Sequence, residues 1–244
     1  MADKIKKSKS GDEKKTKVHK LSLKGSSKLV AEFFHYSINT ILFQRGVYPA
    51  EDFIQVKKYG LNMLVSADDQ VKAYIKKIMS QLDRWMQHGK ISKLVIVITD
   101  KETGEHVERW QFDVDIFNKD AKKSSKSKSS KSAAAAAAAE GGDENNESEG
   151  GKKIVADTNK TEEEIQDEIR ALFRQITATV TFLPQLQSTY TFNVLVYADA
   201  DSEVPVEWGD SDAKEIANGE KVQLRSFSTT NHRVETLVSY RVDS

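Results

Sequence analysis

Residues 91–117 read ISKLVIVITDKETGEHVERWQFDVDIF. The first ten are apolar on both faces, and KETGE (101–105) supplies the polar and glycine residues of a turn. In residues 106–117, large apolar side chains then alternate with polar ones: Trp110, Phe112, Val114 and Ile116. A period of two is typical of a strand with one buried face. The stretch therefore predicts an antiparallel hairpin.

Apolar residues at helical spacing predict three helices around this hairpin. The first lies between residues 26 and 45. The second has Ser66 as its expected cap, with Asp69 three residues later, and ends at Gly89. The third opens with a capping box formed by Thr161 and Glu164, and its apolar seam consists of Ile165, Ile169, Leu172 and Ile176.

The stretch TYTFNVLVYADA (189–200) predicts a strand that is apolar on both faces, with Phe192, Val194 and Val196 on one and Leu195 and Tyr197 on the other. A strand with one wet face should alternate with polar residues, so something must cover its second face. The cover is the chain's own tail, a partner's strand or both, although the residues alone favour an ordinary central strand. Residues 221–242 add two alternating runs around a polar turn at 228–232. The predicted class is α+β, with three helices packed on one face of a mainly antiparallel sheet.

Composition excludes several classes of function. The 244 residues carry 37 Lys and Arg against 37 Asp and Glu, and this balance argues against direct nucleic-acid binding through bulk charge. The chain has no cysteine, which excludes disulfides and thiolate chemistry. We expect a soluble intracellular protein without membrane contact, because neither a secretory signal nor an apolar run of bilayer-spanning length is present.

Two segments have low-complexity composition. Residues 1–20 are rich in lysine, and residues 119–160 contain a Lys/Ser run, an alanine tract and an acidic stretch. Neither can bury enough apolar surface to offset the entropy of ordering, so we expect both to be disordered. The Lys/Ser run resembles a nuclear-import signal, but a solvated basic linker is the favoured interpretation. The expected organisation is a tail at 1–20 and one domain at 21–244, interrupted by 119–160.

No pattern of catalytic or metal-ligating residues emerges. The five histidines have no partner at metal-ligand spacing, and no phosphate-binding glycine loop is present. Asp199, Asp201 and Glu203 resemble the start of a calcium loop, but Val204 and Pro205 stand where that loop needs glycine. We therefore expect no metal, no cofactor and no enzyme activity. Trp85 and Trp110 are interpreted as core residues in preference to ligand contacts.

The remaining class is binding, and five phrases carry a resemblance. They are VAEFFHYSINTILFQRGVYPAEDF (30–53), KYGLNMLVS (58–66), ERWQFDV (108–114), IQDEIRALFRQITATVTFLP (165–184) and LRSFSTTNH (224–232). Together they closely resemble the mitotic-arrest-deficient family of HORMA-domain proteins, which are peptide-binding switches of the spindle assembly checkpoint. The departures are the lysine-rich N-terminus and the insert at 119–160.

The resemblance implies a HORMA fold with a mobile C-terminal "safety belt", here residues 201–244. Its implied members are Trp208, Phe227, His232, Val238 and Tyr240. In the closed state of the family, the belt wraps around a peptide that pairs with the strand matching 189–198. The implied peptide-binding residues are Phe192, Val194, Leu195, Val196 and Tyr197. In the open state the belt occupies that strand's edge, and residues 21–25 must move to let it cross. Two arrangements of one segment make a bistable element.

The resemblance also implies the partners. These are a kinetochore coiled-coil protein and the co-activator of the anaphase-promoting complex, whose capture would delay anaphase. An open–closed homodimer would use Arg174, Gln175 and Phe182, whereas the helical wheel alone predicts only an exposed arginine in a surface ion pair. A HORMA-fold adaptor and an AAA+ remodelling ATPase are implied too, as is action in the nucleus, at the kinetochore and in the cytoplasm. Thr236 is a candidate phosphorylation site that would favour the open form.

Two alternatives remain open at this stage. The chain could be a HORMA peptide-clamping adaptor in another pathway, serving a DNA-repair polymerase or the meiotic axis. It could also be a constitutive scaffold, with its belt locked in one state.

Overall fold

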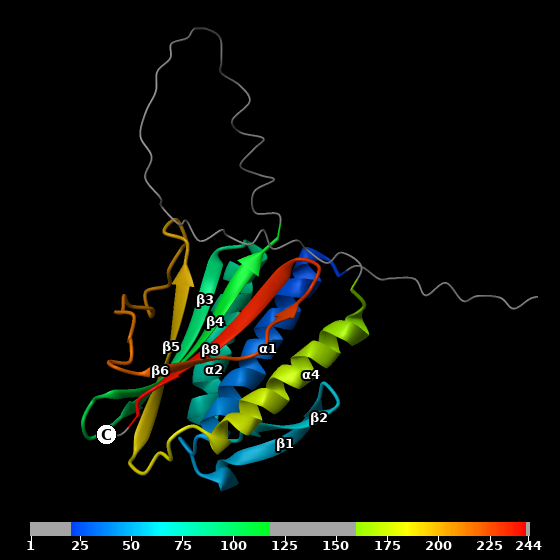
Figure 1. Cartoon of the computed structure of the whole chain (residues 1–244). Coiled ribbons are helices and arrows are strands. Elements are labelled where there is room, and N and C mark those ends of the chain that lie inside the picture. The colour runs from blue at the N-terminus through cyan, green and yellow to red at the C-terminus, as the bar shows by residue number, and fades with distance from the viewer. Residues whose placement is uncertain (1–20, 118–159, 243–244) are drawn as a thin grey trace, which may run out of the picture.

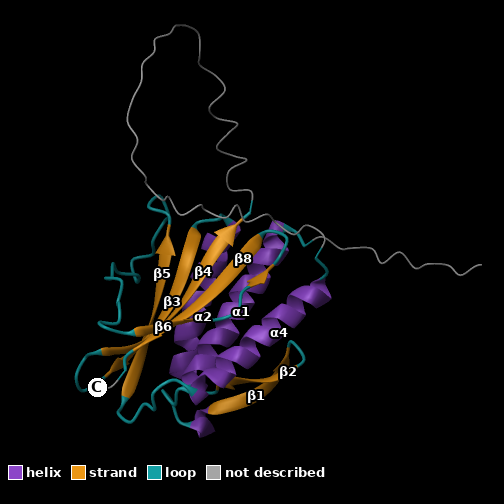
Figure 2. Cartoon of the chain, viewed as in Figure 1, coloured by secondary structure: helices purple, strands orange, loops and turns teal. Residues whose placement is uncertain are grey.

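The structure is a computed structural model that describes residues 21–117 and 160–242. Three α-helices pack on one face of a mainly antiparallel sheet, and a small hairpin lies beyond them (Figures 1 and 2). The predicted α+β class is confirmed. The expectations for residues 1–20 and 119–159, including the import signal, lie outside the described residues.

The helices are α1 (Leu23–Gln44), α2 (Asp69–Gln87) and α4 (Glu162–Ala178), and short 3-10 turns follow α1 at Ala50–Asp52 and α4 at Thr179–Thr181. The capping box of α4 is confirmed, because Thr161 and Glu164 bond reciprocally. The expected cap of α2 was wrong. Asp68 caps that helix by accepting from the backbone N–H groups of Gln70 and Val71, while Ser66 accepts only from the N–H of Asp68.

The main sheet has the strand order β5-β3-β4-β8-β6, with β7 also paired to β8. The hairpin predicted from residues 91–117 is confirmed as β3 (Ile91–Asp100) and β4 (His106–Ile116), which pair antiparallel. The strand β5 (Tyr190–Ala198) pairs with β3. The C-terminal strands are β6 (Glu220–Gln223), β7 (Phe227–Ser228) and β8 (His232–Tyr240). The strand β8 therefore lies next to β4, on the side of the sheet away from β5.

A second hairpin was not predicted. It consists of β1 (Phe53–Lys58) and β2 (Leu61–Ser66), joined at Tyr59 and Gly60, which both have positive φ angles of 51° and 67°. Tyrosine rarely adopts this left-handed conformation, so the turn has Gly60 but lacks the asparagine that usually precedes the glycine in such a turn.

The core lies between the helices and the inner face of the sheet. Phe33 of α1 is its centre, with aromatic rings of four other residues within 6 Å: Phe34, Phe112, Phe173 and Phe227. Trp110 is fully buried, as predicted. Because Phe227 comes from the C-terminal segment, that segment completes the core and is not an appendage to it.

Candidate functional site

The outer edge of β5 is the most unusual surface of the sheet. Within residues 21–117 and 160–242, β5 pairs with β3 alone, so its other edge has no strand beside it. Phe192 and Val194 are each 7% exposed and pack into the core, whereas Leu195 and Tyr197 on the opposite face are half-buried. An unpaired edge presents a row of backbone N–H and C=O groups to whatever lies next to it. The second face, expected to need a cover, is therefore only partly covered. The favoured interpretation as an ordinary central strand was wrong, because β5 is an edge strand of the described sheet.

A cavity of about 350 Å³ adjoins this edge. One wall is formed by residues 194–200 of β5 and its end, and the other by residues 208–212 of the belt, with Trp85 between them. All of the predicted peptide-binding residues except Phe192 line it, namely Val194, Leu195, Val196 and Tyr197. A free strand edge facing a cavity can accept an extended chain through main-chain hydrogen bonds.

The first part of the belt is fastened to α2. The indole N–H of Trp85 donates to the carbonyl oxygen of Glu203 at 3.0 Å, and the rings of Trp85 and Trp208 meet edge to face at 5.2 Å. Just before the belt begins, the backbone N–H of Asp199 donates to the carbonyl of Lys90, which follows α2, at 2.8 Å. Trp85 is 6% exposed, which confirms the core interpretation, yet it also lines the cavity. It thus links the core to the belt.

The last part of the belt reaches the opposite edge of the sheet. In Figure 1 the chain leaves the end of β5, returns along the β5 side and then turns across to β6 and β8. There β8 pairs with β4 along its whole length, from His232↔Ile116 to Glu108↔Tyr240. The predicted belt residues Phe227, His232 and Val238 are at most 1% exposed, and the Tyr240 hydroxyl donates to Glu220 at 2.8 Å. The belt thus spans both edges of the sheet.

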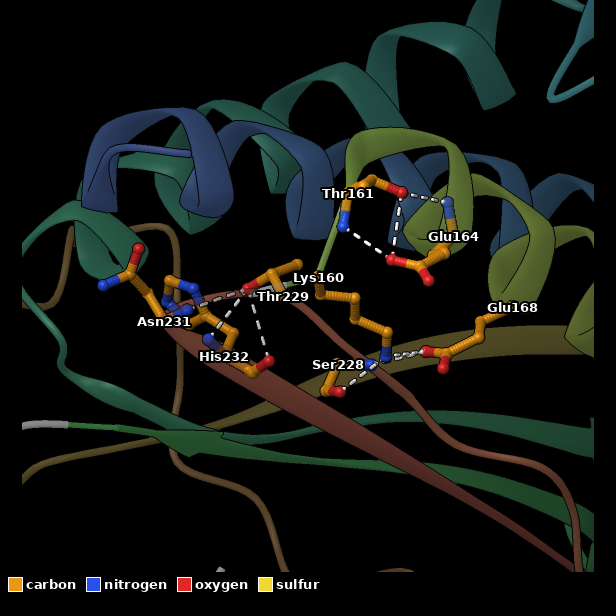
Figure 3. Close-up of polar contacts among 8 residues, drawn as sticks. All are labelled: Lys160, Thr161, Glu164, Glu168, Ser228, Thr229, Asn231 and His232. Carbon is orange, nitrogen blue, oxygen red and sulfur yellow. Dashed lines mark hydrogen bonds and ion pairs between the residues drawn. The ribbon is translucent and has the colours of Figure 1, made fainter. Parts of the chain in front are cut away.

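The turn between β7 and β8 is held by two polar clusters. In Figure 3 the amine of Lys160 lies between the Ser228 hydroxyl and the carboxylate of Glu168, at 2.9 and 2.5 Å. Glu168 in turn accepts from the backbone N–H of Ser228 at 3.1 Å. These contacts join the turn to the start of α4. They were not predicted, because a lysine beside a low-complexity segment gives no sign of a tertiary contact.

The second cluster joins the same turn to α1. The hydroxyl of Ser26 lies 2.5 Å from both the Thr229 hydroxyl and Nδ1 of His232. His232 is fully buried, its Nε2 has no partner among the described residues, and burial lowers its pKa to about 4. The hydroxyl of Thr230 also donates to the carbonyl of Leu21 at 3.0 Å. In this arrangement the start of α1 therefore supports the end of the belt.

Little in the described ranges points to catalysis. Residues 21–117 and 160–242 contain no group of three His, Cys, Asp or Glu side chains that could hold a metal ion. His35, His88, His106 and His232 lie on four separate elements or turns, and His19 is outside the described part. None of the described helices is both long and apolar enough to cross a membrane.

Comparisons with known proteins agree with this geometry. The family model described as "HORMA domain" matches residues 26–232. The mitotic spindle checkpoint component mad2 of Schizosaccharomyces pombe is 53% identical over 222 residues, covering 91% of this chain and 95% of that protein. The chain belongs to the Mad2 family of HORMA-domain proteins. This confirms the family resemblance read from the sequence.

Further relatives of this HORMA chain support the assignment. MAD2 of Saccharomyces cerevisiae is 48% identical, and human MAD2A is 41% identical, each over 91% of this chain and at least 93% of the relative. A chain in the crystal structure of a mitotic checkpoint complex has 51% identity and a TM-score of 0.70, covering 90% of this chain and 100% of that one. Caenorhabditis elegans HTP-1, bound to the HIM-3 closure motif, has a TM-score of 0.66 at 13% identity, covering 91% and 93%, which shows the shared fold alone.

The predicted interface residues of this HORMA domain differ in exposure. Arg174 is exposed, and no described carboxylate pairs with it, because Asp167 pairs with Arg170 instead. Phe182 is 44% exposed, whereas Gln175 is half-buried and accepts from the backbone N–H of Arg225 at 2.7 Å. The ion pair predicted from the helical wheel was therefore wrong, and Gln175 already holds the chain's own belt.

The candidate phosphorylation site of this HORMA domain is inaccessible in the present arrangement. Thr236 is 0% exposed, and its hydroxyl has no hydrogen-bond partner among the described residues. It lies in β8 opposite Phe112 of β4. A kinase could reach this hydroxyl only after β8 had left β4.

Proposed function

We propose that this chain is a spindle-checkpoint clamp that binds a short extended peptide along the free edge of β5 and holds it under the belt. The observation that carries the proposal is the pairing of β8 with β4, which leaves the β5 edge without a strand and facing a cavity. In this mode, main-chain hydrogen bonds supply affinity, and side-chain pockets supply selectivity.

The proposed occupant is a peptide with a basic residue, three apolar residues, a spacer and a proline. We propose that the kinetochore coiled-coil checkpoint protein and the co-activator of the anaphase-promoting complex present it. Capture of the co-activator would hold back ubiquitin ligation in mitosis, so the proposed sites of action are the nucleus, the kinetochore and the cytoplasm. The checkpoint names of relatives at 41–53% identity support this pathway over a polymerase adaptor or a meiotic-axis protein. In this proposal the chain acts by binding, without enzyme activity.

The proposal includes a switch. The present arrangement, with β8 on β4, corresponds to the closed state, and an open state would place the belt on the β5 edge. The two states exclude each other because the peptide and the belt would pair with the same backbone N–H and C=O groups at the free edge of β5. Release of the belt requires breaking the contacts of the 228–232 turn with Ser26 and Leu21, which explains why the start of α1 would have to move.

We also propose that the outer surface of α4 mediates self-association of an open and a closed copy. Exposed Arg174 borders a cavity of about 270 Å³ whose apolar walls include Phe43, Leu61, Met63 and Phe173. An exposed arginine beside an apolar depression is a typical interface hot spot. A HORMA-fold adaptor would use the same surface, and an AAA+ ATPase would reopen the closed copy.

Calorimetric titration tests the clamp. The purified chain is titrated with a synthetic peptide of the proposed class and with its scrambled version. We expect binding of the first alone and about tenfold weaker binding by Leu195→Ala, since a half-buried leucine contributes about 1–2 kcal/mol when a ligand covers it. Leu64→Ala is the matched control, because Leu64 is half-buried in β2, outside both the main sheet and the belt. Equal binding of both peptides, or none, would overturn the proposal.

A further inference from the structure

Arg109 is buried on the face of the sheet that the helices do not cover. Along β4, Trp110, Phe112 and Val114 point into the core, so Arg109 and Gln111 point to the opposite face. A charged residue there should be solvated, yet Arg109 is only 2% exposed. The segment that covers it is the belt.

Each of the three nitrogen atoms of the Arg109 guanidinium has a partner. Its Nε donates to the backbone carbonyl of Ala213 at 3.0 Å, and its Nη1 donates to Oε1 of Gln111 at 2.6 Å. Its Nη2 lies 3.6 Å from the carboxylate of Glu215. Two of these partners, Ala213 and Glu215, belong to the belt. The rigid fork of an arginine thus fixes the position and the orientation of this segment.

The neighbours of Arg109 within the sheet explain its burial. Its Cα partners are Val97 in β3 and Ser239 in β8, which are 0% and 1% exposed. Water therefore cannot easily reach the guanidinium from the side. If the belt left this face, Arg109 would lose its hydrogen bond to Ala213 and its ion pair with Glu215. Because hydrogen bonds made by a charged guanidinium are stronger than those between neutral groups, the loss of these contacts opposes departure of the belt at this point.

The belt segment that Arg109 contacts contains backbone conformations that most residues rarely adopt. Lys214 and Asn218 both have positive φ angles, of 49° and 54°, which residues other than glycine rarely adopt. At Gly219 a Cβ atom would lie 2.6 Å from the side chain of Ile216 and 2.9 Å from the carbonyl oxygen of Tyr240. Such a segment keeps its shape only when its surroundings hold it. Arg109 provides the ionic and polar part of that support.

We infer that Arg109 is a positioning residue that pins the belt across the back of the sheet and thereby slows release of whatever the belt encloses. The part that concerns release rests on the proposed peptide-clamping function. The pin itself does not, because its contacts are present in the chain alone. The two parts can therefore be measured separately.

The pin is tested by limited trypsin digestion of the full chain, followed by mass spectrometry. The bond after Lys214 reports detachment of the belt, and the bond after Lys58, in the distant β1–β2 hairpin, reports general loosening. In Arg109→Met, which keeps an unbranched apolar side chain but has no N–H donors, we expect cleavage after Lys214 to be at least tenfold faster and cleavage after Lys58 to be unchanged. Lys72→Met is the control, because Lys72 forms an ion pair with Asp69 within α2, outside the belt, and it should leave cleavage after Lys214 unchanged.

Equal acceleration at both bonds, or none at Lys214, overturns the inference. Should Arg109→Met fail to fold, Arg109→Lys is used, which keeps the charge but not the fork, and the same preference for Lys214 is expected. The dissociation rate of the synthetic peptide defined above is measured next, and we expect it to rise about tenfold with little change in association. If the wild type does not bind this peptide, the result counts against the proposed function. If the wild type and the variant both bind it and dissociate at the same rate, the role of Arg109 in release is overturned.

Discussion

His232 makes the stability of this fold depend on pH in a predictable direction. Burial lowers the pKa of its imidazole from 6.5 to about 4, so below pH 6.5 the unfolded chain binds a proton that the folded chain does not. The contribution of the neutral His232 ring to the free energy of unfolding is therefore fully present only above about pH 6.5. Stability falls as the pH drops from there to about 4 and then levels off.

The size of the effect follows from the two pKa values. A pKa difference of this size corresponds to at most about 3 kcal/mol, and to about 2 kcal/mol between pH 8 and pH 5. Urea unfolding at a series of pH values, followed by the fluorescence of the three tryptophans, which include buried Trp110, measures the free energy of unfolding. Because other groups titrate as well, the informative quantity is the difference between the wild type and His232→Gln, whose side chain does not titrate.

We expect the wild type to lose about 2 kcal/mol more than His232→Gln over this range. His88→Gln is the control, since His88 is exposed at the end of α2, and it should follow the wild type. Parallel curves for the wild type and His232→Gln would refute the reasoning. They would mean that His232 titrates alike in the folded and unfolded chains.

Three further outcomes are expected. Arg174→Glu should abolish self-association in sedimentation velocity and leave peptide binding nearly intact; an unchanged dimer would refute the interface. Thr236→Glu places a charge where the wild-type residue is 0% exposed, so β8 should leave β4 and ion exchange should show a second conformer, whereas a single unaltered peak would contradict this. Thr161→Ala removes the capping box of α4 and should lower the free energy of unfolding by about 1 kcal/mol in urea titration; no loss would mean that solvent replaces the cap.

The sequence carried enough information for the local elements but not for all of their ends. The β3–β4 hairpin and the α4 capping box were predictable because each rests on residues close together in the chain. Ser66 and Asp68 both have side chains that can cap a helix. Only the direction in which the chain enters α2 decides which of them does so. The β1–β2 turn was missed because Tyr59 adopts a conformation for which tyrosine has little preference.

The arrangement of the belt could not be predicted from local pattern. Alternating strands such as β8 fit either edge of an antiparallel sheet equally well, so the choice of β4 over β5 depends on contacts distant in sequence. Ser26 and Lys160 supply some of these contacts, and Arg109 supplies another. Arg109 sits at a polar position of an alternating strand, where the pattern alone predicts a solvated side chain. Only the position of residues 213–215 shows that it is covered.

The belt's attachment at both ends has a topological consequence. From β5 the covalent chain runs past Trp85 and over Arg109 to β8. The strand pairs β8–β4, β4–β3 and β3–β5 then lead back to β5 through hydrogen bonds. Together these two paths close a loop around the cavity. A polypeptide with folded domains on both sides of the enclosed segment cannot be threaded through such a loop, so it can enter or leave only when the loop opens. Its residence time would then be set by the rate of that opening, and an excess of free competitor peptide would not shorten it.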